Sequence, residues 1–452
     1  MIELTHGFKI STDKCRGRMQ CMRACPTHAI RVKEGKARVI PELCIDCGSC
    51  LGVCPTEAIS ATTINFAELD KFKFKVAVAS PALFSQFGMG DTPVQVGRAL
   101  LDLGFDAVWE YAVDIELIDR AIMEALKKWP GPFPLISNSC PVVVRLIQVA
   151  YPSLVEQVIR LEAPRDIAGR ELKKRYSREL GVRPEEIAAI YLTPCQAKTI
   201  SILQPAEGAK SHLDGAVGIS EIYNDLLFIM RRNAGKDAPP KPLSGVGEWF
   251  LWGAPEGEFP NLPREHYLPV QGLTDVMKVF DDVEKGKIRN IEFLECHACV
   301  GGCIGGNLTV ENLYVARTKN LRMISGMAEP SADFRQEVER RSASEDFSLR
   351  GLLKPRNAGG DVTDLRERVT RRKRADELLK ALPLLNCGLC GAPTCRSHAE
   401  DVAFSRADLK DCVFLSRDRI GFLRGIYGGN NPDGLDHQSR QRHGERGGRD
   451  DG

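Results

Sequence analysis

Short apolar runs alternate with longer amphipathic segments over the middle of the chain, from about residue 71 to about residue 315. The short runs predict strands, and the longer segments repeat their apolar positions every three or four residues, as helices do. The predicted strands are residues 76–79, 107–111, 134–137, 187–192, 215–219 and 291–294, and the predicted helices include residues 94–103, 115–128, 142–159 and 221–231. This alternation indicates an α/β domain with largely parallel sheets.

The length, net charge and cysteine content limit the classes of protein to which the chain can belong. With 452 residues and 43% hydrophobic content, the chain can bury a large core and form several domains. A formal net charge of +2 gives no indication of a nucleic-acid partner, and no apolar run is long enough to span a membrane; Arg145, for example, interrupts one of the longest. The first residues lack a secretory signal, so we expect a cytoplasmic protein. Sixteen cysteines in a reducing compartment indicate metal ligands or redox chemistry rather than disulfides.

The strongest motif is a four-cysteine run near the amino terminus. Its spacing, C-x2-C-x2-C-x3-C followed by proline, is that of bacterial ferredoxins, in which the fourth cysteine serves the neighbouring cluster. The run consists of Cys44, Cys47, Cys50 and Cys54, and an earlier copy supplies Cys15, Cys21 and Cys25. Exchange of the fourth ligands assigns one complete 4Fe–4S site to Cys25, Cys44, Cys47 and Cys50.

The other site of this pair keeps only Cys15, Cys21 and Cys54. Arg18 stands at the position of the missing ligand, and a guanidinium group cannot ligate iron. This three-cysteine site therefore holds a 3Fe–4S cluster, a labile 4Fe–4S cluster or no cluster. Because the two copies form an internal repeat, we expect residues 1–70 to fold as a bacterial-ferredoxin-like α+β domain.

Further cysteines follow predicted strands in the α/β region. Cys140 and Cys195 each come a few residues after a strand, and residues 293–307 pack Cys296, Cys299, Cys303 and four glycines into one segment. Ligands of open α/β sheets bind at the carboxyl ends of strands, thiolates ligate soft metals, and glycines let the backbone approach a bulky centre. Three loops could therefore bring Cys140, Cys195, Cys299 and Cys303 to one cubane. Spacing alone leaves this open, because isolated buried cysteines are common and inert.

The last cluster has the spacing C-x2-C-x4-C-x16-C and consists of Cys387, Cys390, Cys395 and Cys412. Four thiolates also suit zinc, so spacing alone does not exclude that metal. A charged helix, residues 364–382, is predicted before it, and its basic run at residues 371–374 is expected to face solvent. We expect an α/β domain at residues 71–345, a small helical iron–sulfur domain at residues 364–425 and a disordered tail at residues 428–452.

Three of these loops resemble the motifs of the FeFe hydrogenases, and the resemblance runs from about residue 6 to about residue 330. The family motifs TSCCP, MPCxxK and MACPGGCxxGG stand here, in the same order, as SNSCP (137–141), TPCQAK (193–198) and HACVGGCIGG (297–306). The helical connector between the first two motifs also matches. The C-terminal motif is similar to the 4Fe–4S domain of electron-transport and corrinoid iron–sulfur proteins, which also occurs in hydrogenases thought to be sensory.

The resemblance implies an H-cluster, which is a 4Fe–4S cubane joined to a diiron subsite carrying CO, cyanide and a dithiolate. Its cubane ligands would be Cys140, Cys195, Cys299 and Cys303. Cys303 would also bridge to the diiron subsite, and Lys198 would donate to one of its cyanides. A positive ammonium group beside an anionic centre fits this role electrostatically.

The chain departs from the family pattern where hydrogen-evolving members carry protons. Ser139 replaces the cysteine that passes protons to the diiron subsite, and the family's relay glutamates and serine fall on Arg120, Met123 and Ile159. Positioned proton transfer contributes typically 10²–10⁴-fold to a rate, so we expect a slow enzyme. His297 stands where the family has methionine, and it either offers another proton route or is a structural histidine. Cys296 has no counterpart and is expected to be a free buried thiol.

These features predict an iron–sulfur protein that interconverts H2 with protons and electrons slowly, or an H2 or redox sensor whose cluster state alters contact with a separate kinase or phosphatase. Expected partners are a redox carrier such as ferredoxin and the hydrogenase maturation proteins. The alternative is an electron-transfer protein with the cubane but without the diiron subsite. Lys198 and Cys303 favour the diiron subsite, and the missing proton relay favours a sensor over a fast enzyme.

Overall fold

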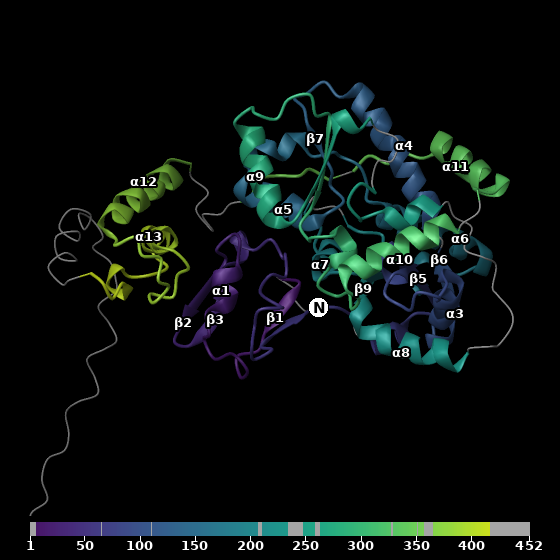
Figure 1. Cartoon of the computed structure of the whole chain (residues 1–452), viewed down its shortest axis with the longest axis horizontal. Coiled ribbons are helices and arrows are strands. Elements are labelled where there is room, and N and C mark those ends of the chain that lie inside the picture. Colours follow the sequence, from purple (N-terminus) through teal and green to yellow (C-terminus); the bar gives the residue numbers. More distant parts are fainter. Residues whose placement is uncertain are drawn as a thin grey trace, which may run out of the picture. The chain divides into compact units, whose positions relative to one another are not determined.

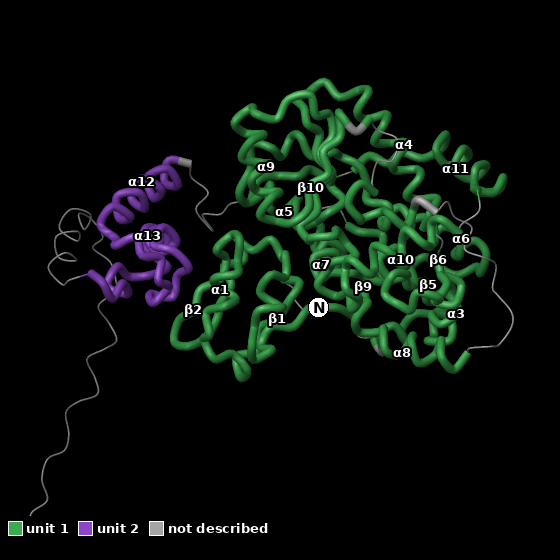
Figure 2. Tube along the Cα trace, viewed as in Figure 1, with its two compact units in different colours: residues 1–363 green, residues 364–452 purple. Residues whose placement is uncertain are grey.

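The computed structural model describes residues 6–64, 66–109, 111–206, 210–233, 247–257, 263–326, 329–349, 351–356 and 365–415. The chain divides into two compact units, residues 1–363 and residues 364–452 (Figure 2). The tail that we predict to be disordered, residues 428–452, lies outside the described residues. Within the described ranges, no helix has the length and apolarity needed to cross a membrane.

The amino-terminal part of the first unit is a small α+β arrangement, as predicted. Strand β1 (Phe8–Ile10) pairs antiparallel with β4 (Ile59–Ala61), and β2 (Ile30–Lys33) pairs antiparallel with β3 (Lys36–Val39). Helix α1 (Gln20–Ala24) buries Met22 against these ribbons. Several of the cysteines belong to the same small core, so the chain packs around its own candidate metal ligands.

Two parallel sheets form the rest of the first unit, which confirms the predicted α/β class. The larger sheet has the order β6 (Ala107–Trp109), β5 (Phe74–Ala79), β8 (Ile187–Thr193) and β9 (Gly215–Gly218). The smaller sheet has the order β10 (Tyr267–Gln271), β11 (Phe293–His297) and β7 (Leu135–Ile136). Strand β8 is buried along its whole length, which explains its unbroken apolar sequence.

Helices connect the parallel strands and pack around them (Figure 1). They are α2 (Pro81–Phe84), α3 (Pro93–Leu103), α4 (Ala112–Lys128), α5 (Pro141–Ala150), α6 (Pro164–Leu180), α7 (Gln196–Leu203), α8 (Ile219–Arg232), α9 (Leu273–Glu284), α10 (Leu313–Ser325) and α11 (Ala332–Ser344). Local sequence sets their ends. Helix α3, for example, begins with a capping box between Thr92 and Gln95 and ends at Gly104, which has a positive φ.

Two predicted elements are wrong in their bounds. The helix predicted over residues 142–159 ends at Ala150, because Pro152 cannot continue it, and a short 3-10 helix (Pro152–Gln157) follows. The strand predicted over residues 291–294 is β11, which continues to His297 because β10 pairs with it as far as the Gln271–His297 position. Cys296 and His297 therefore lie on a buried strand, and only the residues after His297 form the loop.

The second unit is small and helical, as predicted. Helix α12 (Leu365–Ala381) packs against α13 (Cys395–Ala403). Its core includes Ala375, Leu378, Leu382 and Ala399. The two helices and the turns that follow α13 form this core, and two loops and the first turn of α13 carry the four cysteines.

Candidate metal centres

The carboxyl ends of strands from both parallel sheets carry the cysteines that we predict to share a cubane. Cys140 follows β7 and is the N-cap of α5, whereas Cys195 follows β8 and is the N-cap of α7. Cys299 follows β11, and Cys303 lies in the 3-10 helix η7 (Gly302–Gly305). Helix N-termini favour negative charge, so the backbone suits a thiolate at Cys140 and at Cys195.

These four thiols lie close enough for their charges to interact. The charge of Cys303 helps to raise the pKa of Cys140, Cys195 and Cys299, and Cys299 responds to all three of the other thiols. Burial raises the pKa of Cys195 to about 11 and raises that of Cys299 well above its usual value. Iron ligation requires thiolates, so binding of a cluster here must be coupled to proton release.

Lys198 is buried beside this group, on α7. Its ammonium group donates to Cys303 Sγ over 2.9 Å, and the side chain is only 6% exposed. Burial by itself lowers the pKa of Lys198, but the charges of Cys303 and Tyr191 outweigh burial, and the pKa is raised. The structure therefore places a fixed positive charge against the thiol that we predict to bridge two metal groups.

A glycine at a distant position leaves room beside Cys303. A Cβ at Gly253 would lie 2.9 Å from Cys303 Sγ, and its φ of +81° also disfavours a larger residue. The Gly253 carbonyl accepts from the Cys303 amide over 2.5 Å. Four converging thiols in a glycine-lined setting suit an iron–sulfur cluster, and Lys198 suits an anionic group attached at Cys303.

Three other residues that the sequence analysis singled out near these cysteines, Ser139, His297 and Cys296, are not part of the group of four thiols. Ser139 is half-buried, and its amide donates to Ser137 Oγ over 3.2 Å. His297 is buried on β11, and its Nε2 lies 2.5 Å from Glu295 Oε1. The Cys296 side chain is fully buried in the apolar core beside α5 and α9. The pair of His297 and Glu295 fits a structural role for the histidine.

The structure also groups the amino-terminal cysteines as the exchanged ligand sets require. Cys44 and Cys50 interact electrostatically with Cys47 and Cys25, which form the complete set. Cys21 interacts with Cys15 and Cys54, and all three line a cavity of about 20 Å³. The Arg18 side chain is exposed, although the residue also borders this cavity.

One polar side chain within or shortly after each of the three cysteine motifs contacts the loop that contains Asp46 and Cys47. Arg145, five residues after Cys140, forms an ion pair with Asp46. Gln196 Nε2 donates to the Asp46 carbonyl over 2.7 Å, and Asn307 Nδ2 donates to the Cys47 carbonyl over 2.9 Å. The following residue, Gly48, has a φ of +77°, and any Cβ there would collide with the Gln196 and Asn307 amides.

This contact joins the complete ferredoxin-like site to the predicted cubane. Cys47 is near enough to Cys299 for their charges to interact. Burial alone would raise the pKa of Asp46, but His6, whose Nδ1 lies 3.7 Å from Asp46 Oδ1, and the charge of Arg145 hold it below its usual value. The sequence offered one sign of this contact, because Arg145 is a charged residue inside an apolar helical run.

The three positions of the family's proton relay carry no acid, as predicted. Arg120 lies at the surface and pairs with Glu116 at 3.0 Å and with Glu339 at 2.7 Å. Met123 and Ile159 pack into the main apolar core. None of the three side chains can pass a proton at neutral pH.

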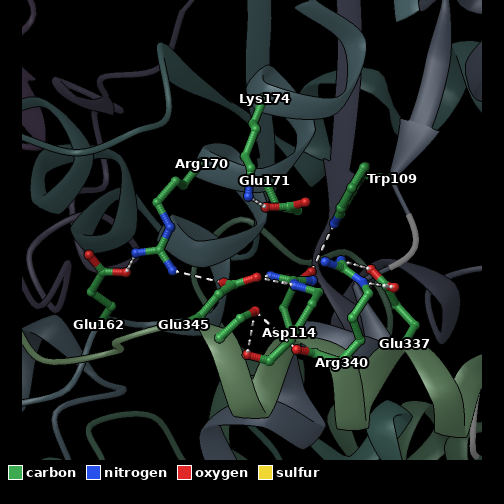
Figure 3. Close-up of polar contacts among 11 residues, drawn as sticks. Trp109, Asp114, Glu162, Arg170, Glu171, Lys174, Glu337, Arg340 and Glu345 are labelled. Carbon is green, nitrogen blue, oxygen red and sulfur yellow. Dashed lines mark hydrogen bonds and ion pairs between the residues drawn. The ribbon is translucent and has the colours of Figure 1, made fainter. Parts of the chain in front are cut away.

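Buried acids occur elsewhere in this region and were not predicted. Asp114 on α4 accepts from Trp109 Nε1 over 2.8 Å and from Arg341 over 3.0 Å, and burial raises its pKa to about 6. Figure 3 shows that Glu345 and Arg170 continue these contacts toward Glu162. Glu162 lines a cavity of about 90 Å³ that Asn138 and Pro141 of the first motif also border. This network joins α4, α6 and α11.

The second unit gathers its four cysteines around one cavity. Cys387, Cys390, Cys395 and Cys412 all line a space of about 20 Å³. Cys390 interacts electrostatically with Cys412 and Cys387, and burial raises its pKa. Two loops and the first turn of α13 thus bring together cysteines that are up to 25 residues apart in the sequence.

Comparison with known protein families matches three segments of the chain. Residues 73–226 and 262–307 match the iron only hydrogenase large subunit, C-terminal domain. Residues 8–55 match a 4Fe-4S dicluster domain, and residues 382–414 match an Fe-S cluster family. The chain is therefore an iron–sulfur protein. It carries an iron-only hydrogenase large-subunit domain between two smaller iron–sulfur domains, which confirms the resemblance seen in the motifs.

Individual relatives are distant. The NADP-reducing hydrogenase subunit HndD of Solidesulfovibrio fructosivorans is 22% identical over 327 residues, which cover 58% of this chain and 55% of that protein. The periplasmic Fe hydrogenase large subunit of Nitratidesulfovibrio vulgaris is 26% identical over 396 residues, which cover 71% of this chain and 93% of that protein. The chain thus spans about half the length of the first of these relatives.

Two further comparisons concern one part of the chain or its fold. Ferredoxin 7Fe of Hydrogenibacillus schlegelii is 38% identical over 52 residues, which cover 11% of this chain and 67% of that protein. A solved structure of a variant of the FeFe-hydrogenase HydA1 from Chlamydomonas reinhardtii is 17% identical with a TM-score of 0.48, and covers 64% of this chain and 97% of that chain.

Proposed function

We propose that this chain is an FeFe-hydrogenase-type oxidoreductase that slowly interconverts H2 with protons and electrons. The observation that carries the proposal is the contact of Lys198 with Cys303, at the point where thiols from three strand ends meet. The proposed cubane ligands are Cys140, Cys195, Cys299 and Cys303. When bound at Cys303, a diiron subsite supplies the redox-active iron at which H2 and protons interconvert.

Residues of the protein would bind the diiron subsite and place a positive charge beside it. Cys303 would hold both the cubane and the diiron subsite through its thiolate, and Lys198 would donate a hydrogen bond to a cyanide ligand of the subsite. Because Lys198 is buried and positively charged, it stabilises an anionic group more strongly than a solvated lysine would. Maturation proteins are the proposed source of the diiron subsite.

The proposed electron route begins at the other clusters. We assign a 4Fe–4S cluster to Cys25, Cys44, Cys47 and Cys50, and the electrostatic contact of Cys47 with Cys299 supports direct transfer to the cubane. We assign a 3Fe–4S cluster to Cys15, Cys21 and Cys54, and a further 4Fe–4S cluster to the second unit. A redox carrier such as ferredoxin is the proposed external partner.

We attribute low turnover to the residues that occupy the positions of the family's proton relay in this chain. Ser139 does not titrate near neutral pH, Arg120 and Met123 cannot pass protons there, and positioned proton transfer contributes typically 10²–10⁴-fold to a rate. A slow enzyme suits H2 or redox sensing, in which the cluster state would alter contact with a separate kinase or phosphatase. We propose that His297, hydrogen-bonded to Glu295, is structural.

A viologen assay of protein matured with the diiron precursor tests the proposal. We expect H2 evolution with reduced viologen and H2 uptake with oxidised viologen, both slow. Lys198→Gln should abolish both activities, whereas Lys174→Gln, at a lysine with a side chain 54% exposed, should change neither. No activity in either direction, with all other clusters intact, would instead support an electron-transfer protein without the diiron subsite.

A further inference from the structure

The second unit exposes large apolar side chains next to its cysteines. Leu384, Leu385, Leu389, Val413 and Phe414 are each between 50% and 64% exposed. All five lie within three residues of Cys387, Cys390 or Cys412. We call these five side chains the apolar rim.

The apolar rim borders the cavity that the four cysteines share and is separate from the core. Leu389, Val413 and Phe414 line the same cavity as the cysteines. The core of this unit is formed instead by buried residues of α12, α13 and the adjoining turns. Folding of the unit therefore does not account for the rim, and contiguous exposed apolar residues commonly mark a protein contact site.

The second unit, which carries the apolar rim, has a surplus of basic charge. Helix α12 contains seven lysines and arginines against three acidic residues, and residues 365–415 contain ten against seven. Arg396, directly after Cys395, is 51% exposed and pairs with Asp376 at 3.3 Å, and Lys410 is 65% exposed and pairs with Asp408 at 3.4 Å, so the basic surplus of the unit comes mainly from α12. A partner for this surface should therefore be acidic, because complementary charge speeds encounter and like charge opposes it.

The basic surplus argues against two alternative partners for the apolar rim, namely the amino-terminal region of the same chain and a second copy of the chain. Residues 6–64 contain nine basic and five acidic residues, so the amino-terminal cluster region is basic too. A second copy of the chain would present the same basic helix. Both contacts would bring like charges together.

We propose that the apolar rim is the docking surface for an acidic electron-carrier protein. Helix α12 steers the carrier, and the rim excludes water where the two clusters face each other. One electron then leaves the carrier's cluster and reduces the 4Fe–4S cluster of the second unit, and no atom is transferred. The inference rests on the proposed function in one respect, namely that the second unit holds that cluster. The expected interface is small and transient, as is usual for electron-transfer partners.

Titration calorimetry of the full-length, anaerobically reconstituted protein with an acidic plant-type 2Fe–2S ferredoxin tests this proposal. Leu389→Gln and Phe414→Gln should each weaken binding about tenfold, because each removes apolar area that the carrier buries. The matched control is Val369→Gln, a change at a residue 47% exposed on α12 but outside the cysteine loops, and it should change binding less than about twofold. Higher salt should slow association of the wild-type protein.

Wild-type affinity in both rim variants would overturn the proposal, and so would the absence of ferredoxin binding to the wild type. A change in the sedimentation of the variants without ferredoxin would also overturn it, because the rim would then serve contacts of the chain with itself. Failure of the proposed function has a different signature. Zinc in the second unit, or missing diiron infrared bands, would be measured independently of ferredoxin binding.

Discussion

Arg145 of α5 and Asp46 of the ferredoxin-like region form an ion pair in which both side chains are only 2% exposed. The pair connects the two proposed cluster regions, since Asp46 stands between Cys44 and Cys47 in the sequence and α5 begins directly after Cys140. Removal of one partner of a buried pair leaves an uncompensated charge. The two residues are therefore expected to control the charge beside the complete ferredoxin-like cluster.

Single substitutions in this pair should shift the cluster potential in opposite directions. Arg145→Gln leaves the Asp46 carboxylate uncompensated, which stabilises the oxidised cluster and lowers its midpoint potential. Asp46→Asn leaves the guanidinium group uncompensated and raises the potential. The double variant should return close to wild type, and each single variant should lose about 3–5 kcal/mol of stability. Redox titration followed by electron paramagnetic resonance measures the potentials.

A surface pair provides the control for this test. Arg160 pairs with Glu156, and its side chain is 46% exposed. Arg160→Gln removes the same charge where water screens it, so the potential should stay unchanged. Shifts of the same sign in both single variants of the buried pair would show that the pair acts through structure rather than charge.

The three-cysteine site should hold a 3Fe–4S cluster. Protein oxidised without air should show the paramagnetic signal of that cluster, and Arg18→Cys should replace it with a 4Fe–4S signal after reduction. The matched control is Arg16→Cys, since Arg16 borders the same cavity but does not stand at the missing ligand position. Two ordinary 4Fe–4S clusters in the wild type would mean that an unrecognised ligand completes the site.

The second unit should bind iron rather than zinc. Cys390→Ser in the full-length protein should lower the iron content by one cluster and reduce the visible charge-transfer absorption in proportion. Cys296→Ser provides the control, because Cys296 belongs to none of the proposed ligand sets and lies in the first unit, and the iron content of this variant should match wild type. Stoichiometric zinc in the wild type, with no change in absorption on Cys390→Ser, contradicts the assignment.

Restoring the family's relay should speed H2 evolution. Ser139→Cys supplies a thiol with an ordinary pKa of about 8.5, far nearer neutrality than a hydroxyl, and should raise the rate modestly. Adding Arg120→Glu and Met123→Glu should raise it further and non-additively, up to about 10²-fold, because a relay acts as a unit. Turnover at saturating reductant measures the effect.

The charge change at position 120 requires its own control. Arg120→Gln breaks the ion pairs with Glu116 and Glu339 without supplying an acid, so it should not speed turnover. A triple variant that folds, carries its full complement of clusters and is no faster than wild type would exclude proton delivery as the cause of slow turnover.

Local sequence was sufficient to predict six of the seven strands that the described residues form in the two parallel sheets, and the cysteines that follow these strands, but it missed β10 (Tyr267–Gln271). Apolar runs such as residues 187–192 are buried in parallel sheets, and a cysteine directly after such a run must lie at a strand end. The end of helix α5 at Ala150 could also have been predicted from the sequence, because Pro152 cannot continue a helix. The errors at β11 and at this helix concern boundaries, which depend on pairing as well as on local pattern.

The contacts between distant segments could not be predicted in the same way. Arg145 and Asp46 are 99 residues apart, and Asn307 reaches Cys47 over 260 residues. A charged residue in an apolar run indicates that a partner exists but not which residue it is. The closeness of Gly253 to Cys303 also depends on the folded chain, because no motif connects the two.

Infrared spectroscopy of the matured protein tests the central claim most directly, since CO and cyanide ligands absorb where protein does not. We predict such bands in the wild type and their loss in Cys303→Ala, while the clusters of the ferredoxin-like region and of the second unit stay intact. Absence of the bands from fully matured wild type, or their persistence in Cys303→Ala, would contradict a diiron subsite held by Cys303.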